Sequence, residues 1–200
     1  MSNRGQFSAV LLMVGILALL SAACATQSND ETSRATSSAS PAVTTSPTPV
    51  TLSSSDKQFV MEAAQGGSAE VQLGNLAVQK AASSDVKQFG QRMVDDHSRV
   101  GDELKQFASR KNVSLSSEIG AQHQEVIDRL SKLSGKEFDR AYMAEMLKDH
   151  EKDVAAFDRI SQQGNDPDLR AWTTKSLPTL REHLQMAQDI ARKVGAAPKS

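Results

Sequence analysis

The feature that most constrains the fold is a long stretch without proline. Residues 56–166 contain no proline, and strong helix formers dominate them. Proline is the residue that most disrupts a helix interior, so this composition favours long helices with short breaks. No segment alternates apolar and polar residues as a half-buried strand would. The sequence therefore predicts an all-α domain over residues 56–195.

Breaks rich in serine and glycine divide this domain into helices. The predicted long helices cover residues 56–82, 85–111, 136–163 and 167–194, and a shorter helix covers residues 117–133. Ser54 or Ser55 is expected to cap the first helix. Ser134 and Glu137 have the spacing of a capping box before the third long helix. Asp166, followed by a proline, is expected to cap the last one.

Apolar residues recur at helical spacing on each long helix, which predicts one buried face per helix. On the second long helix these residues are Val86, Phe89, Met93, Val100, Leu104 and Phe107. Small residues mark the first helix, among them Gly67 and Gly74, and would allow close helix approach. Four long helices with a short helix in the crossover between the second and third predict a four-helix bundle of ferritin-like arrangement.

The first 24 residues have the pattern of an export signal. Arg4 precedes an apolar run over residues 10–20, which is too short to span a membrane comfortably. Small residues then lead to Cys24, the arrangement at which a lipoprotein signal peptidase cleaves before the cysteine is lipidated. Cleavage after Ala25 is the alternative, and it would release a soluble protein without Cys24. The pattern favours lipidation at Cys24.

Residues 25–55 form a segment of Ser, Thr, Pro and Ala with almost no large apolar side chain. Such a segment cannot bury enough surface to fold, and its prolines favour extended conformations. It is therefore a predicted disordered tether. With the lipid anchor, it predicts an exported cell-envelope protein held to a membrane on the extracytoplasmic side, such as the periplasm; the choice between inner and outer membrane stays open.

Charge and cysteine content exclude several classes of function. The chain has 23 basic and 24 acidic residues, a net charge of −1, and no basic surface stretch of the kind that binds nucleic acid. Its single cysteine excludes an internal disulfide and a thiolate metal cluster. The membrane is thus the only partner that the sequence indicates, and no protein partner is identified.

Four polar residues fall on the otherwise apolar helix faces. His97, His150 and His183 lie within the buried stripes of their helices, and Glu70 lies between small residues of the first helix. Counted from the connecting turns, all four positions come near the middle of the bundle. One carboxylate and three imidazoles are therefore expected to meet in one interior layer.

Such a layer must pair internally, hold water or bind an ion, because an unsatisfied buried polar group costs about 1–3 kcal/mol. A lone histidine on an apolar stripe is usually a core residue without a ligand, and a metal-free polar layer is one interpretation. The alternative is a single metal ion, Zn, Fe or Cu, at these four residues. Met93 and Met146, one turn before His97 and His150, would add thioether ligands that favour copper, although methionine usually fills cores.

Four stretches resemble an exported bacterial family catalogued as domain of unknown function 4142. They are residues 63–74 (AAQGGSAEVQLG), 93–97 (MVDDH), 134–139 (SGKEFD) and 177–184 (LPTLREHL). The resemblance extends over residues 57–190. It implies a ferritin-like fold and the label of a predicted outer membrane protein, which describes a location rather than an activity.

The sequence departs from di-iron ferritin-like proteins, which carry Glu-x-x-His motifs. The residues three positions before the histidines are Val94, Leu147 and Leu180. No other catalytic motif appears, which favours a protein that is not an enzyme. The first hypothesis is a membrane-tethered helical module with a structural, stress-related or binding role. The alternative is a metal-binding or redox protein that uses the Glu/His layer; an enzyme acting on envelope polymers has no motif in its favour.

Overall fold

A computed structural model describes residues 51–196. It contains the helices α1 (Ser54–Lys80), α2 (Ser84–Arg110), α3 (Ala121–Ser131), α4 (Gly135–Gln163) and α5 (Pro167–Val194). The described part of the chain has no strand, so the all-α prediction is confirmed. The expected signal segment with Cys24, and residues 25–50 of the expected tether, lie outside the described residues.

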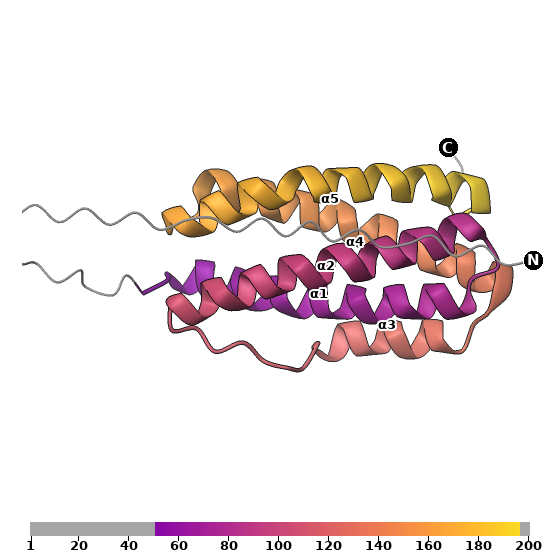
Figure 1. Ribbon diagram of the computed structural model, residues 1–200, viewed down its shortest axis with the longest axis horizontal. Helices are drawn as coiled ribbons and strands as arrows, with labels where there is room; N and C mark the ends of the chain where they lie inside the picture. Colours follow the sequence, from indigo (N-terminus) through magenta and orange to yellow (C-terminus); the bar gives the residue numbers. More distant parts are fainter. Residues whose placement is uncertain (1–50, 197–200) are drawn as a thin grey trace, which may run out of the picture. The chain divides into compact units, whose positions relative to one another are not determined.

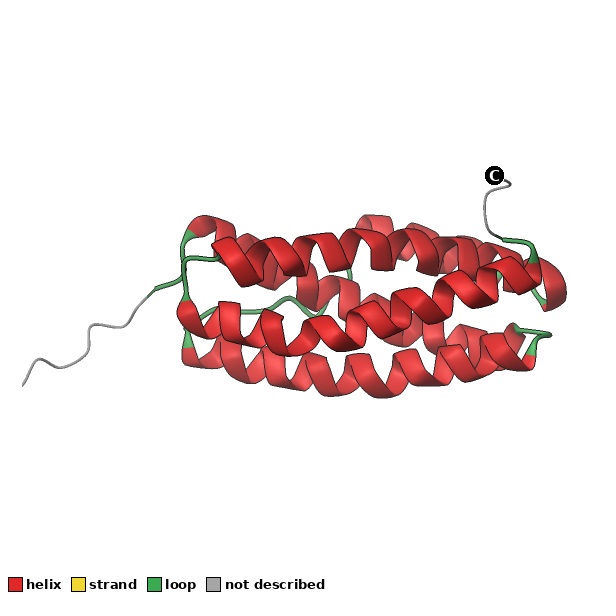
Figure 2. Cartoon of the chain, turned by 90° about the horizontal axis from the view of Figure 1, so that it is seen from above, coloured by secondary structure: helices red, strands yellow, loops and turns green. Residues whose placement is uncertain are grey.

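The four long helices form two hairpins that lie side by side (Figure 1). Helix α1 packs chiefly against α2, and α4 packs chiefly against α5. The view from above shows the same arrangement of long, nearly aligned helices (Figure 2). The short helix α3 lies in the connection between the hairpins and packs mainly on α1. This is the predicted position of the short helix in the chain.

One predicted helix cap is wrong, and another is confirmed in position but lacks its expected hydrogen bond. The N-cap of α1 is Ser53 rather than Ser54 or Ser55, and its hydroxyl accepts a hydrogen bond from the amide of Asp56 at 3.1 Å. Ser134 is the N-cap of α4, but its side chain makes no capping hydrogen bond, so the capping box does not form. The short helix begins at Ala121, later than the predicted residue 117, because Gly120 has a φ of +79°, which is outside the helical region.

The predicted cap of α5 is confirmed. Asp166 Oδ1 accepts hydrogen bonds from the amides of Asp168 and Leu169 at 2.9 and 3.0 Å, and Pro167 takes the first helical position. These contacts satisfy two of the amides that a helix N-terminus leaves without intrahelical partners. Asp166 thus fixes the start of the helix that carries His183.

Two glycines set the distance between α1 and α2. A Cβ atom at Gly74 would lie 2.5 Å from the carbonyl oxygen of Gly90, and one at Gly90 would lie 2.6 Å from Ala77 Cβ. Carbon atoms cannot approach this closely, so only glycine allows the observed backbone contact. The predicted close approach of the first helix therefore occurs at Gly74.

The apolar core consists of two clusters with a polar layer between them. One cluster, at the α1–α2 turn end, includes Leu73, Phe89, Tyr142 and Met146. The other, at the opposite end, comprises Phe59, Val60, Leu104, Phe107, Ala108, Val113, Phe157, Ile160, Leu169, Trp172, Leu177 and Leu180. On α1 the buried carboxylate of Glu70 comes between the members of the two clusters. None of the described helices has an apolar stretch long enough to cross a membrane.

Candidate metal centre

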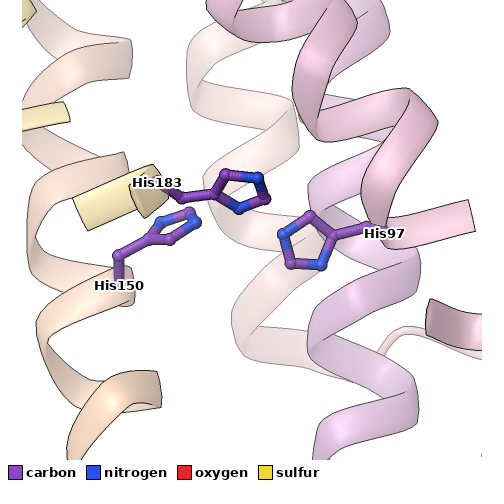
Figure 3. Close-up of side chains that lie close together, drawn as sticks. All are labelled: His97, His150 and His183. Carbon is purple, nitrogen blue, oxygen red and sulfur yellow. The ribbon is translucent and has the colours of Figure 1, made fainter. Parts of the chain in front are cut away.

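Glu70, His97, His150 and His183 come from α1, α2, α4 and α5, one residue from each long helix. All four are buried, with exposed fractions between 0 and 7%. The three imidazoles converge in the interior of the bundle, as Figure 3 shows. One ring nitrogen from each histidine lies within 4.8 Å of one from each of the others. The structure therefore brings together the four residues of the predicted layer.

Glu70 is the acidic member of the layer and contacts two of the histidines. Its Oε2 lies 2.9 Å from His97 Nδ1, and its Oε1 lies 3.6 Å from His150 Nε2. A carboxylate accepts protons and does not donate them, so the contact with His97 assigns a proton to His97 Nδ1. The second nitrogen of His97, Nε2, is then a lone-pair donor in the neutral ring.

The other two imidazoles are oriented by acceptors outside the layer. His150 Nδ1 donates to the carbonyl oxygen of Met146 at 2.9 Å, which assigns the lone pair to His150 Nε2. His183 Nε2 donates to Asp96 Oδ2, also at 2.9 Å, which assigns the lone pair to His183 Nδ1. Arg92 and Arg99 bind the same Asp96 carboxylate and hold it in place.

Each histidine therefore has one nitrogen next to an acceptor oxygen and one nitrogen without a hydrogen-bond partner. The unpartnered atoms are His97 Nε2, His150 Nε2 and His183 Nδ1, all buried and without a hydrogen bond from the described residues. Metal-binding histidines typically have this division of roles, in which the second ring nitrogen donates to a carboxylate or carbonyl oxygen.

The charges in the layer are strongly coupled. Burial alone would raise the pKa of Glu70, but attraction to His97 and His150 outweighs it and lowers the pKa to about 2. Burial would lower the pKa of His97, yet the Glu70 carboxylate raises it above the usual 6.5. Burial, with repulsion from the other two imidazoles, lowers the pKa of His183 to about 4 despite its hydrogen bond to Asp96. At neutral pH the layer thus holds an ionised Glu70 and a neutral His183.

Asp96 and Asp153 are functional candidates that the sequence prediction missed. Asp96 orients His183 by accepting a hydrogen bond from its ring. Burial would raise its pKa, and the hydrogen bonds from Arg92 and His183 lower it to about 2. The pKa of Asp153 is raised to about 8 by burial and by the negative charges of Glu70 and Asp149. The acidic groups around the layer therefore extend beyond Glu70.

The structure places the two candidate methionines in the apolar core. Met93 and Met146 are fully buried in the cluster that includes Phe89 and Tyr142. They lie one turn before His97 and His150 on the same helices, and their role as ligands stays a prediction. The remaining histidine, His123, is half-buried on α3 and is not among the three clustered imidazoles.

A cavity of about 470 Å³ adjoins the layer and is lined by Glu70, His97 and His183. His150 is not among the lining residues, but its α4 neighbours Asp149 and Asp153 are, so all four long helices contribute to the wall of the cavity. Its volume lies in the range of about 300–1,000 Å³ that is usual for small-molecule sites. An ion or a water molecule could therefore reach the imidazoles.

The comparisons with known proteins bear on family and fold. The model of a family described as a domain of unknown function, DUF4142, matches residues 41–190. The chain belongs to this family. The resemblance noted in the sequence is thus confirmed, and the DUF4142 match covers every helix except the last four residues of α5. No curated protein matches the chain.

A solved structure has a similar fold. It is the crystal structure of a DUF305 fragment from Deinococcus radiodurans, with a TM-score of 0.63. The similarity covers 72% of this chain and 99% of that chain, at 13% sequence identity. At this identity the similarity concerns the fold alone, and it places the DUF4142 domain among all-α folds.

Proposed function

We propose that the helical domain binds a single divalent transition-metal ion through His97, His150 and His183. The observation that carries this proposal is the set of three buried imidazole nitrogens without partners, each on a ring whose other nitrogen is already bound. Leaving such groups unsatisfied costs about 1–3 kcal/mol each, so a bound ion would remove a penalty present in the empty layer. The ligand set also explains why the polar layer interrupts the core.

The spacing of the nitrogens is compatible with this role. A metal–nitrogen distance of about 2.0–2.1 Å places the nitrogens of a tetrahedral site roughly 3.4 Å apart. One ring nitrogen from each histidine lies within 4.8 Å of those from the other two. The distances between these nitrogens would shorten by up to about 1.4 Å around an ion. Small side-chain rotations are enough for such a movement.

Glu70 and the adjoining cavity would complete the site. Glu70 Oε1 lies 3.6 Å from His150 Nε2, so the carboxylate is close enough to act as a fourth ligand or to neutralise the ion. The cavity offers a route of entry and space for a water ligand. Three neutral imidazoles and a carboxylate suit Zn²⁺, Cu²⁺ or Fe²⁺ rather than the hard cations Mg²⁺ and Ca²⁺.

Metal analysis of the purified full chain tests this function. After removal of metals with a chelator, titration with Zn²⁺, Cu²⁺ and Fe²⁺ should load one ion per chain, and Mg²⁺ should not bind. His150→Ala should abolish stoichiometric loading. The matched control is His123→Ala, which removes an imidazole that lines the cavity but lies outside the cluster; it should retain one ion.

The opposite result would favour the structural hypothesis. If the full chain binds no ion, or if His123→Ala and His150→Ala lose loading equally, the layer is a metal-free polar core. Its unpartnered nitrogens would then be satisfied by water. Thermal unfolding with and without chelator separates the two cases, because an ion bound only to the folded state raises the unfolding temperature.

The cellular location is a second part of the proposal. The short apolar segment before Cys24 and the Ser/Thr/Pro-rich residues after it support export, lipidation at Cys24 and a tether that holds the domain near a membrane. The mass of the mature N-terminus distinguishes lipidation from cleavage after Ala25. Cys24→Ala should move the protein from the membrane fraction to the soluble fraction; a wild-type protein already soluble would contradict the anchor.

A further inference from the structure

The cavity beside the polar layer is a second candidate site, distinct from the ion. On α1 it extends from Phe59 to Glu70, which at 1.5 Å per residue corresponds to about 16 Å along the bundle. It is therefore longer than an ion with its water ligands requires. Its two ends differ in chemistry.

The end away from the layer is aromatic. Phe59, Phe157 and Trp172 line it, and their rings pack against one another, with centroids 5.1 Å apart for Phe59–Phe157 and 5.3 Å for Phe157–Trp172. Leu104 and Leu180 line the cavity as well. Trp172 is only 8% exposed, and its Nε1 has no partner among the described residues. This end is suited to an apolar body.

The end at the layer is acidic. Glu70, Asp149 and Asp153 line it, and neither Asp149 nor Asp153 takes part in an ion pair within residues 51–196. Lys152 is the one lining lysine, and it is exposed. Burial together with neighbouring negative charge raises the pKa of Asp153. Asp153 is therefore largely protonated at pH 7, and a positive charge placed here would favour its ionised form, whereas a negative charge would disfavour it.

We propose that this cavity binds a small molecule with an apolar body and a protonated amine at one end. The apolar body lies against Phe59, Phe157 and Trp172. The amine lies near the carboxyl groups of Asp149 and Asp153, which have no cationic partner within ion-pair distance among the described residues. The cavity volume of about 470 Å³ accommodates a ligand of this kind. The proposal concerns the metal-free protein and does not depend on the ion.

The chain contains its own reporter of occupancy. Trp172 is the single tryptophan of the 200 residues and lines this cavity, so tryptophan fluorescence reports on it. Octylamine, octanol and octanoate are probes with the same chain length that differ in the charge of the head group. At pH 7 the amine is protonated and the acid ionised.

The experiment titrates the full-length, metal-free chain with each probe in the presence of a chelator. Octylamine should change Trp172 fluorescence saturably, with a dissociation constant at least about tenfold below those of octanol and octanoate. Asp153→Asn should weaken octylamine binding by about fivefold or more and leave octanol binding unchanged. Its matched control is Glu151→Gln, which removes the same charge from an exposed position of α4 and should change neither.

A cavity-filling variant tests the location. Gly101 lines the cavity, and a Cβ atom there would meet no atom within 4 Å, so Gly101→Leu should fold and abolish the fluorescence response to all three probes. Circular dichroism verifies folding, and Gly66→Leu, with equally free space on α1, replaces it if it does not fold. No saturable response to octylamine, octanoate binding as tight as octylamine binding, or an unchanged response in a folded Gly101→Leu would each overturn the proposal.

Discussion

Asp56 and Asp139 each hold the turn of the other hairpin. Asp139, near the start of α4, accepts hydrogen bonds from the amides of Ala82 and Ser83 in the α1–α2 turn, both at 3.0 Å. Asp56, near the start of α1, accepts from the amides of Asn165 and Asp166 in the α4–α5 turn, at 3.0 and 2.9 Å. The two hairpins are thereby fixed in register, and this register brings the four residues of the polar layer to one level.

Replacing either aspartate should destabilise the fold. Asp56→Asn and Asp139→Asn each place an amide NH₂ where a backbone N–H needs an acceptor, which should lower the free energy of unfolding by about 1–3 kcal/mol. Urea denaturation monitored by circular dichroism measures this. Asp102→Asn, at an exposed ion pair with Lys105, is the control and should change it by less than about 0.5 kcal/mol. Equal stability of all three variants would show that the two turns are not held in this way.

The contact between α1 and α2 predicts opposite effects for two glycine substitutions. Gly74→Ala should destabilise by about 1–3 kcal/mol, since its methyl group would collide with the carbonyl of Gly90. Gly101→Ala, whose methyl group meets no atom within 4 Å, should stabilise by about 0.5–1 kcal/mol through helix propensity. Thermal unfolding compares the two. A Gly74→Ala protein as stable as wild type would contradict the close contact.

Much of this fold follows from local signals in the sequence. Helical periodicity and the scarcity of proline predicted the helices to within a few residues, and spacing from the turns predicted that His97, His150 and His183 would meet. The cap of α1 was misassigned because Ser53, Ser54 and Ser55 are equally good caps by composition, and only the path of the chain selects Ser53.

Asp96 and Asp153 could not be assigned in the same way, because their roles depend on other helices. Asp96 lies beside the apolar stripe of α2 and reaches His183 only through the packing of α5 on α2. One signal was nevertheless present for Asp153. It follows Glu70 by 83 positions, as Asp139 follows Asp56 and as the N-cap Asp166 follows the N-cap Ser83. This repeat between the hairpins indicates that Asp153 on α4 corresponds to Glu70 on α1.

Asp96 should act on the metal through His183. Asp96→Asn removes the negative charge that orients the ring, and it should weaken metal affinity by about 10–100-fold while leaving one ion per chain at saturation. Asp95→Asn is the matched control, since the neighbouring Asp95 is exposed and, within residues 51–196, is hydrogen-bonded only to Gln91; the metal affinity of this variant should equal that of the wild type. Competition titration with a chromogenic chelator measures both. Equal affinities in the two variants would exclude this positioning role.

The ion pair at the start of α5 predicts a dependence of stability on pH. Burial would raise the pKa of Asp166, but Lys111, 2.7 Å away, and the amides of Leu169 and Asp168 lower it below 3.8. A carboxyl with a lowered pKa in the folded state stabilises the protein above its unfolded pKa, and this contribution is lost as the pH falls through the folded pKa. Asp166→Asn keeps a capping residue. The loss in its free energy of unfolding relative to the wild type therefore reports the charge alone.

The free energy of unfolding of Asp166→Asn should be about 1–3 kcal/mol below that of the wild type between pH 5 and pH 7. This difference should become smaller below about pH 4. Urea denaturation at pH 7, 5 and 3 measures it. The exposed Asp102→Asn provides a baseline without such a change. A difference that is the same at pH 3 as at pH 7 would mean that the charge of Asp166 does not contribute.

The central claim concerns three imidazoles around one ion, and X-ray absorption spectroscopy of the zinc-loaded full chain measures this coordination directly. We expect three imidazole nitrogens at about 2.0–2.1 Å, reduced to two or fewer in His97→Ala, His150→Ala and His183→Ala, and unchanged in His123→Ala. A spectrum with oxygen ligands only, or one that these three substitutions leave unaltered, would contradict the assignment of the layer as a metal centre.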